Sequence, residues 1–324
     1  MKITINSKRI INAKSDRTIF ESAISNGITI DHSCLNGRCS ACKVKVLSGD
    51  FYMPVSQEGL TINDIDDRYC LTCITTPKSD LRLEEVRYTE GILPEVKILP
   101  AKISKLEFLS EEVTKLTLRT PPNNKLIFLA GQYVDLSVKS IKRSYSIASK
   151  PSESELEFII KKYPNGEFSN YLFNEAKIGD LLRIEGPKGT YILSKKLEET
   201  IVFLSTGTGI APNLSLIKFV LEKQLLKPYQ IILIHGQRYK KEHVYNLTEI
   251  FPEIKVIQTT SKERERGMFH GYVQDALLEE KLDIKKTQVF ACGNPRMITS
   301  AEEKLIENGL LSSNFKSDIF VKSD

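Results

Sequence analysis

Five of the six cysteines lie within the first 73 residues of the chain. Cys34, Cys39 and Cys42 form a C-x4-C-x2-C segment, and Cys73 follows after thirty intervening residues. The small residues of this segment, Gly37, Ser40 and Ala41, would let backbone N–H groups reach the sulfur atoms. Such spacing is that of plant-type 2Fe-2S centres, in which four thiolates hold two irons. The crowding of cysteines thus predicts a metal centre and not a disulfide framework.

A zinc site is the alternative chemistry for these thiols. The pairs Cys39-x2-Cys42 and Cys70-x2-Cys73 could form a four-cysteine zinc ribbon. That arrangement leaves Cys34 and its x4 spacing without a role. We therefore favour a 2Fe-2S cluster.

Two further segments predict a flavin site. Arg143-Ser144-Tyr145-Ser146 matches R-x-Y-[ST], where the guanidinium can pair with a phosphate and the flat tyrosine ring can cover an isoalloxazine. Gly166-Glu167-Phe168-Ser169 precedes an amphipathic segment, so the N–H groups of a helix N-terminus would face a pyrophosphate. Alone, each also fits an ordinary strand or a turn with a serine N-cap. Together and in this order they predict FAD.

A nucleotide site is predicted near the middle of the chain. Gly207-Thr208-Gly209-Ile210-Ala211-Pro212 follows the apolar run 201–204 and opens a helix expected over 213–225. Glycines there allow the backbone to approach a pyrophosphate. Cys292-Gly293-Asn294-Pro295 ends a second apolar run, at the carboxyl edge where parallel sheets bind ligands. Cys292 could be inert packing; we place it at the reacting edge.

Three kinds of periodicity predict the elements that position these motifs. Residues 2–13 alternate as a hairpin, and 16–26 reads as a helix, in a compact α+β unit over 1–93. A linker is expected over 93–100. Many short strands and turns predict an antiparallel β-barrel over 97–196. Short apolar runs separated by helix-length segments predict an α/β domain with a parallel sheet over 197–324.

Composition excludes several classes of protein. The 324 residues are 41% hydrophobic and 27% charged, as in ordinary globular proteins. We find no apolar run of the roughly 18–20 residues that a membrane helix needs, and the strand-like N-terminal residues are not a secretory signal, so we expect a cytoplasmic protein. The net charge is +5, and it is too diffuse to indicate a nucleic-acid partner.

The order of the motifs resembles iron–sulfur flavoprotein reductases of the ferredoxin–NADP reductase superfamily. Within it, the chain is similar to the CDP-6-deoxy-delta-3,4-glucoseen reductases of dideoxysugar biosynthesis. The stretches that carry this resemblance are 130–136, 143–148, 181–187 and the tail Ser317-Asp318-Ile319-Phe320-Val321. The resemblance implies a β-grasp ferredoxin-like domain, an FAD-binding barrel and an NAD-binding domain. It covers nearly the whole chain.

The resemblance also implies a role for each matching residue. Cys34, Cys39, Cys42 and Cys73 would ligate the cluster, and Cys70 would be a spare thiol. Arg143, Ser144, Tyr145, Ser146, Gly166 and Ser169 would bind FAD, with Ser146 near the reactive nitrogen. Gly207, Thr208 and Gly209 would hold the dinucleotide, Cys292 would face the nicotinamide, and Phe320 would be the C-terminal aromatic. The chain departs from the family at Ser205-Thr206, before the first glycine of the nucleotide motif.

Electron counting gives the expected function. A nicotinamide delivers two electrons as a hydride and a 2Fe-2S cluster accepts one, so a flavin must stand between them. The expected route is NADH to FAD to cluster to a partner enzyme, with Ser146 and Cys292 at the reacting centre. The partner would be the dehydratase of the 3,6-dideoxysugar system; the alternatives are an oxygenase component, or a non-catalytic iron–sulfur sensor. Lys262 and Phe269 favour NADH, while Arg264 and Arg266 leave NADPH open.

Overall fold

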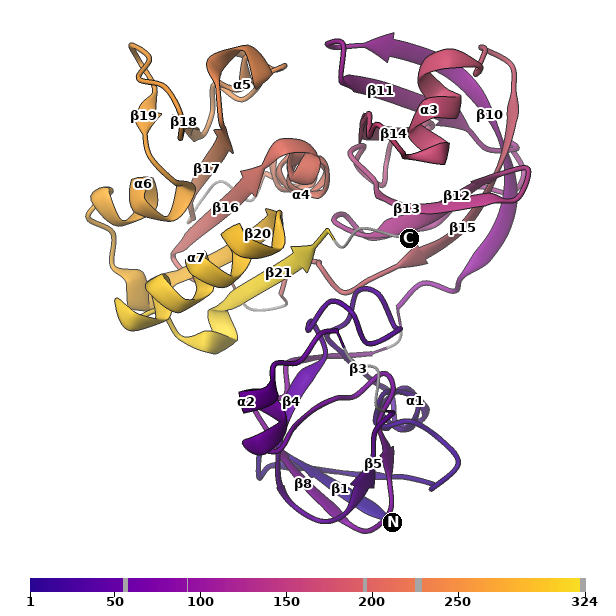
Figure 1. Ribbon diagram of the computed structural model, residues 1–324, viewed down its shortest axis with the longest axis vertical. Coiled ribbons are helices and arrows are strands. Elements are labelled where there is room, and N and C mark those ends of the chain that lie inside the picture. Colours follow the sequence, from indigo (N-terminus) through magenta and orange to yellow (C-terminus); the bar gives the residue numbers. More distant parts are fainter. Residues whose placement is uncertain (55–57, 92, 195–196, 225–228, 321–324) are drawn as a thin grey trace. The chain divides into compact units, whose positions relative to one another are not determined.

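The computed structural model describes residues 1–54, 58–91, 93–194, 197–224 and 229–320. These residues fall into two compact units, 1–93 and 94–324 (Figure 1). The sequence-based boundary between 196 and 197 adjoins residues 195–196, which lie outside the described residues. Among the helices that the structure describes, each is too short or too polar to cross a membrane.

The first unit is a mixed five-stranded sheet covered by one helix, which confirms the predicted β-grasp fold. The sheet order is β2-β1-β8-β4-β6, with β1 antiparallel to β2 and parallel to β8. Thr18 and Glu21 form a capping box that starts α1, and Ile19 and Ala23 pack it on the core. The elements are β1 (Lys2–Ile5), β2 (Arg9–Asn12), α1 (Ile19–Ser25), β3 (Ile28–Ile30), β4 (Lys43–Ser48), β5 (Phe51–Tyr52), α2 (Ile62–Asp66), β6 (Tyr69–Leu71), β7 (Thr76–Pro77), β8 (Leu81–Glu84) and β9 (Tyr88–Glu90).

The second unit begins with the predicted antiparallel barrel. Its strand order is β13-β12-β15-β10-β11-β14. The N–H of Ala148 donates to the carbonyl of Glu157 at 2.7 Å, which joins the chain after β13 to β14. The predicted linker is shorter than expected, because β10 already starts at Lys97. The elements are β10 (Lys97–Phe108), β11 (Val113–Arg119), β12 (Tyr133–Val138), β13 (Ile141–Ser146), β14 (Leu156–Lys161), α3 (Glu167–Asn174) and β15 (Leu181–Lys188).

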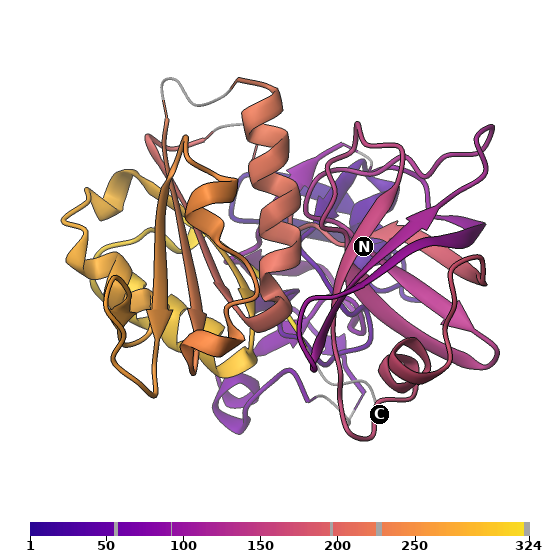
Figure 2. The ribbon, with the colours of Figure 1, turned by 90° about the horizontal axis from the view of Figure 1, so that it is seen from above.

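A six-stranded parallel sheet completes the second unit, as predicted. Its order is β19-β18-β17-β16-β20-β21. Figure 2 shows α4 standing along one face of this sheet, and α6 and α7 pack on the core of the other face. The elements are β16 (Thr200–Thr206), η1 (Gly207–Gly209), α4 (Ile210–Glu222), β17 (Gln230–Gln237), η2 (Lys240–Glu242), α5 (Leu247–Ile250), β18 (Lys255–Thr260), β19 (Phe269–His270), α6 (Val273–Glu279), η3 (Ile284–Lys286), β20 (Thr287–Gly293), α7 (Pro295–Glu307), η4 (Ser312–Asn314) and β21 (Phe315–Ile319).

The barrel and the parallel sheet share one hydrophobic core. Ala130, Ala148 and Tyr191 from the barrel segment belong to the same buried cluster as Ile210 and Leu214 of α4. α4 begins at Ile210, three residues earlier than the sequence predicted. Pro212 fits inside its first turn, because the N–H groups of a first turn need no partner within the helix.

Candidate functional site

The loop between β3 and β4 carries three of the four predicted cluster cysteines. Its backbone turns sharply, with φ of +54° at Leu35, +84° at Gly37 and +57° at Ser40. A Cβ at Gly37 would lie 2.8 Å from Cδ1 of Ile74, so that side chain would have to move, and the positive φ itself favours glycine there. The Ser40 hydroxyl donates to the carbonyl of Gly59 at 2.6 Å and fastens the loop to the next segment.

The cysteines of this loop meet in two pairs. The N–H of Cys34 donates to Sγ of Cys39 at 3.3 Å, and the two side chains are hydrogen-bonded. Sγ of Cys42 lies 3.3 Å from Sγ of Cys73. Hydrogen bonding from Cys39 lowers the pKa of Cys34 to about 5 despite burial, and Cys73 likewise lowers the pKa of Cys42. Each pair therefore brings two sulfur atoms close together.

This arrangement fits a cluster with two irons better than a single metal ion. In the part of the chain that the structure describes, no three His, Cys, Asp or Glu side chains converge on one point as ligands of a single ion. Four cysteines in two pairs match the two thiolates that each iron of a 2Fe-2S cluster takes from the protein. Backbone N–H groups of Asn36 and Arg38 also point at Sγ of Cys34, at 3.5 and 3.3 Å.

Cys70 lies elsewhere in the first unit. It is fully buried on β6, opposite Val44 of β4, in the core of the β-grasp sheet. Burial raises the pKa of its thiol to about 12, so it stays protonated. The structure thus brings Cys73, and not Cys70, to the cluster loop.

The two predicted flavin segments lie side by side. Arg143 and Tyr145 are paired with Leu136 and Val134 of β12, so their side chains leave the same face of the sheet as these two residues. The ring of Tyr145 packs on Phe168 of α3 with centroids 5.2 Å apart. A terminal nitrogen of Arg143 lies 3.4 Å from the carboxylate of Glu167, the first residue of α3. The guanidinium therefore stands at the helix N-terminus, as a phosphate site requires.

Gly166 and Ser169 shape this N-terminus. The hydroxyl of Ser169 donates to the carbonyl of Gly166 at 3.0 Å and accepts from the N–H of Tyr163 at 3.1 Å. A Cβ at Gly166 would lie 2.6 Å from that hydroxyl oxygen. The Ser169 side chain is thus engaged within the turn, and the N–H groups of the first helical turn are the donors that this segment can offer to a phosphate.

Ser144 points away from these residues. It lies opposite Asp135 on the other face of β13, and its hydroxyl donates to that carboxylate at 2.6 Å. Asp135 also pairs with Lys188 at 2.7 Å and with Lys142 at 3.0 Å. Burial alone would raise the pKa of Asp135, but the bonds from Lys188, Ser144 and Lys142 outweigh it and lower that pKa. Ser144 therefore anchors the strand that carries Arg143 and Tyr145.

The nucleotide loop fills the carboxyl end of β16. Gly207 has a φ of +57° and faces open space, whereas a Cβ at Gly209 would lie only 2.4 Å from the carbonyl oxygen of Cys292. Thr208 is half-buried between them. The loop is thus pressed against the end of β20, and its open side is at Gly207.

The departure at Ser205-Thr206 has a structural role. The Ser205 hydroxyl is hydrogen-bonded to Nδ1 of His235 at 2.9 Å, and both side chains are buried. Burial, together with the neighbouring His243, lowers the pKa of His235 to about 3, so this imidazole is neutral. The N–H of Asn294 donates to the Thr206 hydroxyl at 3.4 Å. Both hydroxyls therefore hold β16 to its neighbours just before the loop.

Three predicted residues and one unpredicted residue meet where the barrel faces the parallel sheet. The Ser146 hydroxyl donates to Oδ2 of Asp318 at 3.4 Å, although 172 residues separate them. Asp318 lies opposite Cys292 in the β20–β21 pairing, and the N–H of Phe320 donates to the carbonyl of Gly293 at 3.1 Å. Val321 lies outside the described residues. Sequence reasoning missed Asp318 as a site residue; its one signal was an acid within a short apolar tail.

Burial determines the chemistry of Cys292. The side chain has no exposed surface, and burial, with the charge of Asp318 adding, raises its pKa well above that of an ordinary thiol. Cys292 is therefore a neutral thiol, a weak hydrogen-bond donor and not a nucleophile. Ser146 and Asp318 are also nearly buried, at 6% and 5% exposure. Water is largely excluded from this junction.

Three family models match successive parts of the chain. Residues 3–78 match the 2Fe-2S iron–sulfur cluster binding domain, 100–192 the oxidoreductase FAD-binding domain, and 203–303 the oxidoreductase NAD-binding domain. The fold is also that of the cytochrome P450 reductase GcoB from Amycolatopsis, with a TM-score of 0.73 at 22% identity over 99% of this chain and 98% of that one.

Several curated proteins are similar over nearly their whole length. The CDP-6-deoxy-L-threo-D-glycero-4-hexulose-3-dehydrase reductase of Yersinia pestis is 35% identical over 97% of this chain and 96% of its own. Protein RfbI of Salmonella typhimurium is 31% identical over 97% and 94%. The ferredoxin–NAD(P)(+) reductase component of the naphthalene 1,2-dioxygenase/salicylate 5-hydroxylase systems of Ralstonia sp is 27% identical over 97% and 96%.

Proposed function

The chain belongs to the iron–sulfur flavoprotein reductases of the ferredoxin–NADP reductase superfamily, and we propose that it reduces a sugar-nucleotide dehydrase. It is an oxidoreductase that uses NADH, FAD and a 2Fe-2S cluster for electron transfer. The 35% identity to a CDP-hexulose dehydrase reductase over both whole chains supports this partner over an oxygenase component, since the reductase components of oxygenases in these comparisons are 26–30% identical.

One structural observation supports the electron-transfer route. The same chain holds two pairs of cysteines in its first unit and the buried Ser146–Asp318 contact beside Cys292 in its second. Bound FAD accepts two electrons as a hydride and releases them singly, as a 2Fe-2S cluster requires. A sensor module would need the cysteine pairs alone.

Separate groups of residues would bind the cluster, the flavin and the dinucleotide. Cys34, Cys39, Cys42 and Cys73 hold the cluster, while Arg143 and the first turn of α3 hold the FAD phosphates. Tyr145 supports the flavin ring. Gly207, Thr208 and Gly209 let the backbone approach the dinucleotide pyrophosphate.

At the reacting centre, Ser146 Oγ keeps its proton on the bond to Asp318, and the neutral Cys292 thiol lines the nicotinamide side without competing as a base. Phe320, held by the carbonyl of Gly293, would cover this centre. Because these side chains are almost fully buried, the centre excludes water, which protects a hydride donor from side reactions.

We also assign the units and the compartment. Residues 1–93 form the cluster domain, 97–196 the flavin domain and 197–324 the nicotinamide domain. Cys70 and Cys292, the two cysteines that we do not assign to the cluster, form no disulfide, which fits a reducing compartment such as the cytoplasm.

The electron route is tested by removing the cluster while leaving the flavin. Cys42→Ala should still bind FAD and reduce ferricyanide from NADH, because that small acceptor takes electrons directly from flavin, but cytochrome c reduction should fall sharply. Cys70→Ala is the matched control in the same unit and should keep both activities. Full cytochrome c reduction by Cys42→Ala would contradict the route.

The partner is tested separately by reconstitution. Wild type with a CDP-6-deoxy-hexulose 3-dehydrase and its substrate should show NADH oxidation coupled to product, and Cys42→Ala should not. If NADH oxidation is coupled to an oxygenase component and not to the dehydrase, the partner is the oxygenase component.

A further inference from the structure

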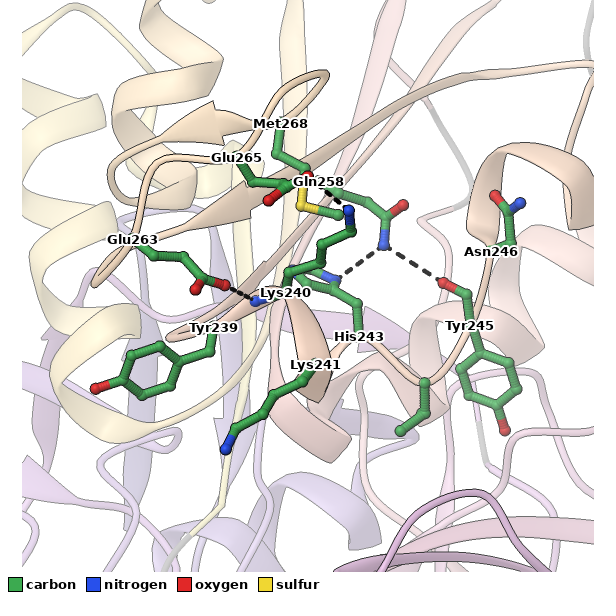
Figure 3. Close-up of a pocket in the computed structure, with 11 residues that line it drawn as sticks. Tyr239, Lys240, Lys241, His243, Tyr245, Asn246, Gln258, Glu263, Glu265 and Met268 are labelled. Atoms are coloured by element: carbon green, nitrogen blue, oxygen red, sulfur yellow. Dashed lines mark hydrogen bonds and ion pairs between the residues drawn. The ribbon is translucent and has the colours of Figure 1, made fainter.

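A pocket of about 870 Å³ opens between the segment that follows β17 and the segment that follows β18 (Figure 3). Tyr239, Lys240, Lys241, His243 and Asn246 line it from the first segment, and Glu263, Glu265 and Met268 from the second. Gln258 of β18 forms its floor, with its amide nitrogen 2.9 Å from Nδ1 of His243. The pocket therefore lies at the carboxyl ends of β17, which neighbours β16 and its glycine loop, and of β18, which is one strand further from β16.

Charges alternate along the second segment. Residues 262–266 read Lys-Glu-Arg-Glu-Arg; Glu263 and Glu265 are half-buried and line the pocket, whereas Lys262, Arg264 and Arg266 are exposed. The basic-looking segment thus turns its carboxylates to the pocket and its cations to solvent. Arg264 and Arg266, the residues that left NADPH open in the sequence, are thus not part of the pocket lining.

The two carboxylates also restrain the nearest cation. The backbone N–H of Lys240 donates to Glu263, and its ammonium lies 2.5 Å from Oε1 of Glu265 (Figure 3). Burial lowers the pKa of His243, which adds no positive charge near neutral pH. Lys240 and Lys241 thus balance the two glutamates, and the lining has no surplus of positive charge for a dianion.

We propose that Glu263 and Glu265 make the enzyme select NADH over NADPH. The inference rests on the proposed function, because a pyrophosphate on the Gly207–Gly209 loop places the adenosine end along this sheet edge. Neighbouring strands are about 4.8 Å apart, so the end of β18 lies about 10 Å from that of β16, within the reach of a ribose and its base. Carboxylates accept hydrogen bonds from a ribose diol and repel a 2′-phosphate.

Binding of two adenosine fragments tests this without electron transfer. Isothermal titration calorimetry of the full chain gives the ratio of the affinities for 5′-AMP and 2′,5′-ADP. The ratio is measured for wild type, for Glu263→Gln/Glu265→Gln, and for Arg264→Gln/Arg266→Gln. Wild type should prefer 5′-AMP. The glutamine variant should shift the ratio toward 2′,5′-ADP by about tenfold or more, equivalent to about 1.4 kcal/mol. The arginine variant, altered in the same segment, should shift it by less than about twofold, since its charges are exposed and screened.

Three outcomes would overturn the proposal. These are an unchanged ratio in the glutamine variant, a larger shift in the arginine variant, and wild type that prefers 2′,5′-ADP. Should the double variant fail to fold, Glu265→Gln alone must still shift the ratio in the same direction, because it releases the ammonium of Lys240. Steady-state kcat/KM with NADH and NADPH should follow the same order. A chain that shows the fragment ratios but reduces no protein acceptor would speak against the proposed function and not against this selection.

Discussion

Two glycines of the nucleotide loop are required for opposite reasons, and alanine substitutions separate them. Gly209 has an ordinary helical backbone, with φ of −60°, but an added Cβ would lie 2.4 Å from the carbonyl oxygen of Cys292 and 2.6 Å from Cα of Gly293. Gly207 has a φ of +57° and nothing within 4 Å of its Cβ position. Position 209 lacks space for a side chain, and position 207 needs a left-handed backbone.

The two substitutions should therefore lower the free energy of unfolding by different amounts. A left-handed alanine costs roughly 1–2 kcal/mol, of which about 0.4–1 kcal/mol is offset because alanine stiffens the unfolded chain. Gly207→Ala should therefore lose about 1 kcal/mol. At Gly209 the clashing atoms are backbone and have no alternative rotamer, so the loss should reach the upper end of the roughly 1–3 kcal/mol seen for overpacking.

Both losses of stability are measured by thermal unfolding in the absence of coenzyme, with the release of flavin as the signal. For a unit of this size 1 kcal/mol corresponds to about 2–4 °C in Tm, so Gly207→Ala should lose about 2–4 °C and Gly209→Ala about twice that or more. Gly207→Asn should recover part of the loss, because asparagine tolerates positive φ. A smaller loss for Gly209→Ala than for Gly207→Ala would refute the packing of this loop on β20.

Three further predictions concern the rest of the molecule. Cys73→Ala should abolish the visible 2Fe-2S absorption while Cys70→Ala retains it, and equal loss in both would contradict the ligand assignment. Because the pKa of Asp135 is lower in the folded than in the unfolded chain, its ion pairs stabilise the protein above its ordinary pKa of about 3.9 and this stabilisation is lost on further acidification. In urea unfolding, the free energy of unfolding should fall less between pH 6 and pH 3 in Asp135→Asn than in wild type. An equal fall in both proteins would exclude this contribution. Ser146→Ala should slow flavin reduction by NADH at least about tenfold with FAD content unchanged; stopped-flow absorbance measures it, and an unchanged rate would remove Ser146 from the reacting centre.

Local patterns predicted the main elements of all three parts of the chain, whereas the β-grasp fold of the first unit was implied by the family resemblance. The alternation over residues 2–13 became the β1–β2 hairpin, and the helix predicted over 16–26 became α1 at Ile19–Ser25. The apolar runs at 201–204 and 289–291 became adjacent parallel strands. Each signal depends on residues close together in the chain, where side-chain periodicity follows directly from backbone geometry.

Contacts between distant segments could not be predicted in the same way. Ser146 and Asp318 come from two different sheets, and only the packing of one sheet against the other brings them together. The same holds for residues 262–266, where the alternating charges are visible in the sequence but their exposure is not. Ser144 was predicted to bind cofactor from its place in the motif, yet the β12–β13 register turns it toward Asp135.

The division of the chain into two compact units matches a division in its chemistry. Hydride transfer needs reacting atoms about 3–3.5 Å apart and well aligned, so the residues around it must be held rigidly. Ser146, Cys292 and Asp318 all lie in the unit 94–324, whose barrel and parallel sheet share one core. An electron needs no such contact between donor and acceptor. The cysteine pairs can therefore reside in a unit with its own core, 1–93, without loss of the precision that the hydride step demands.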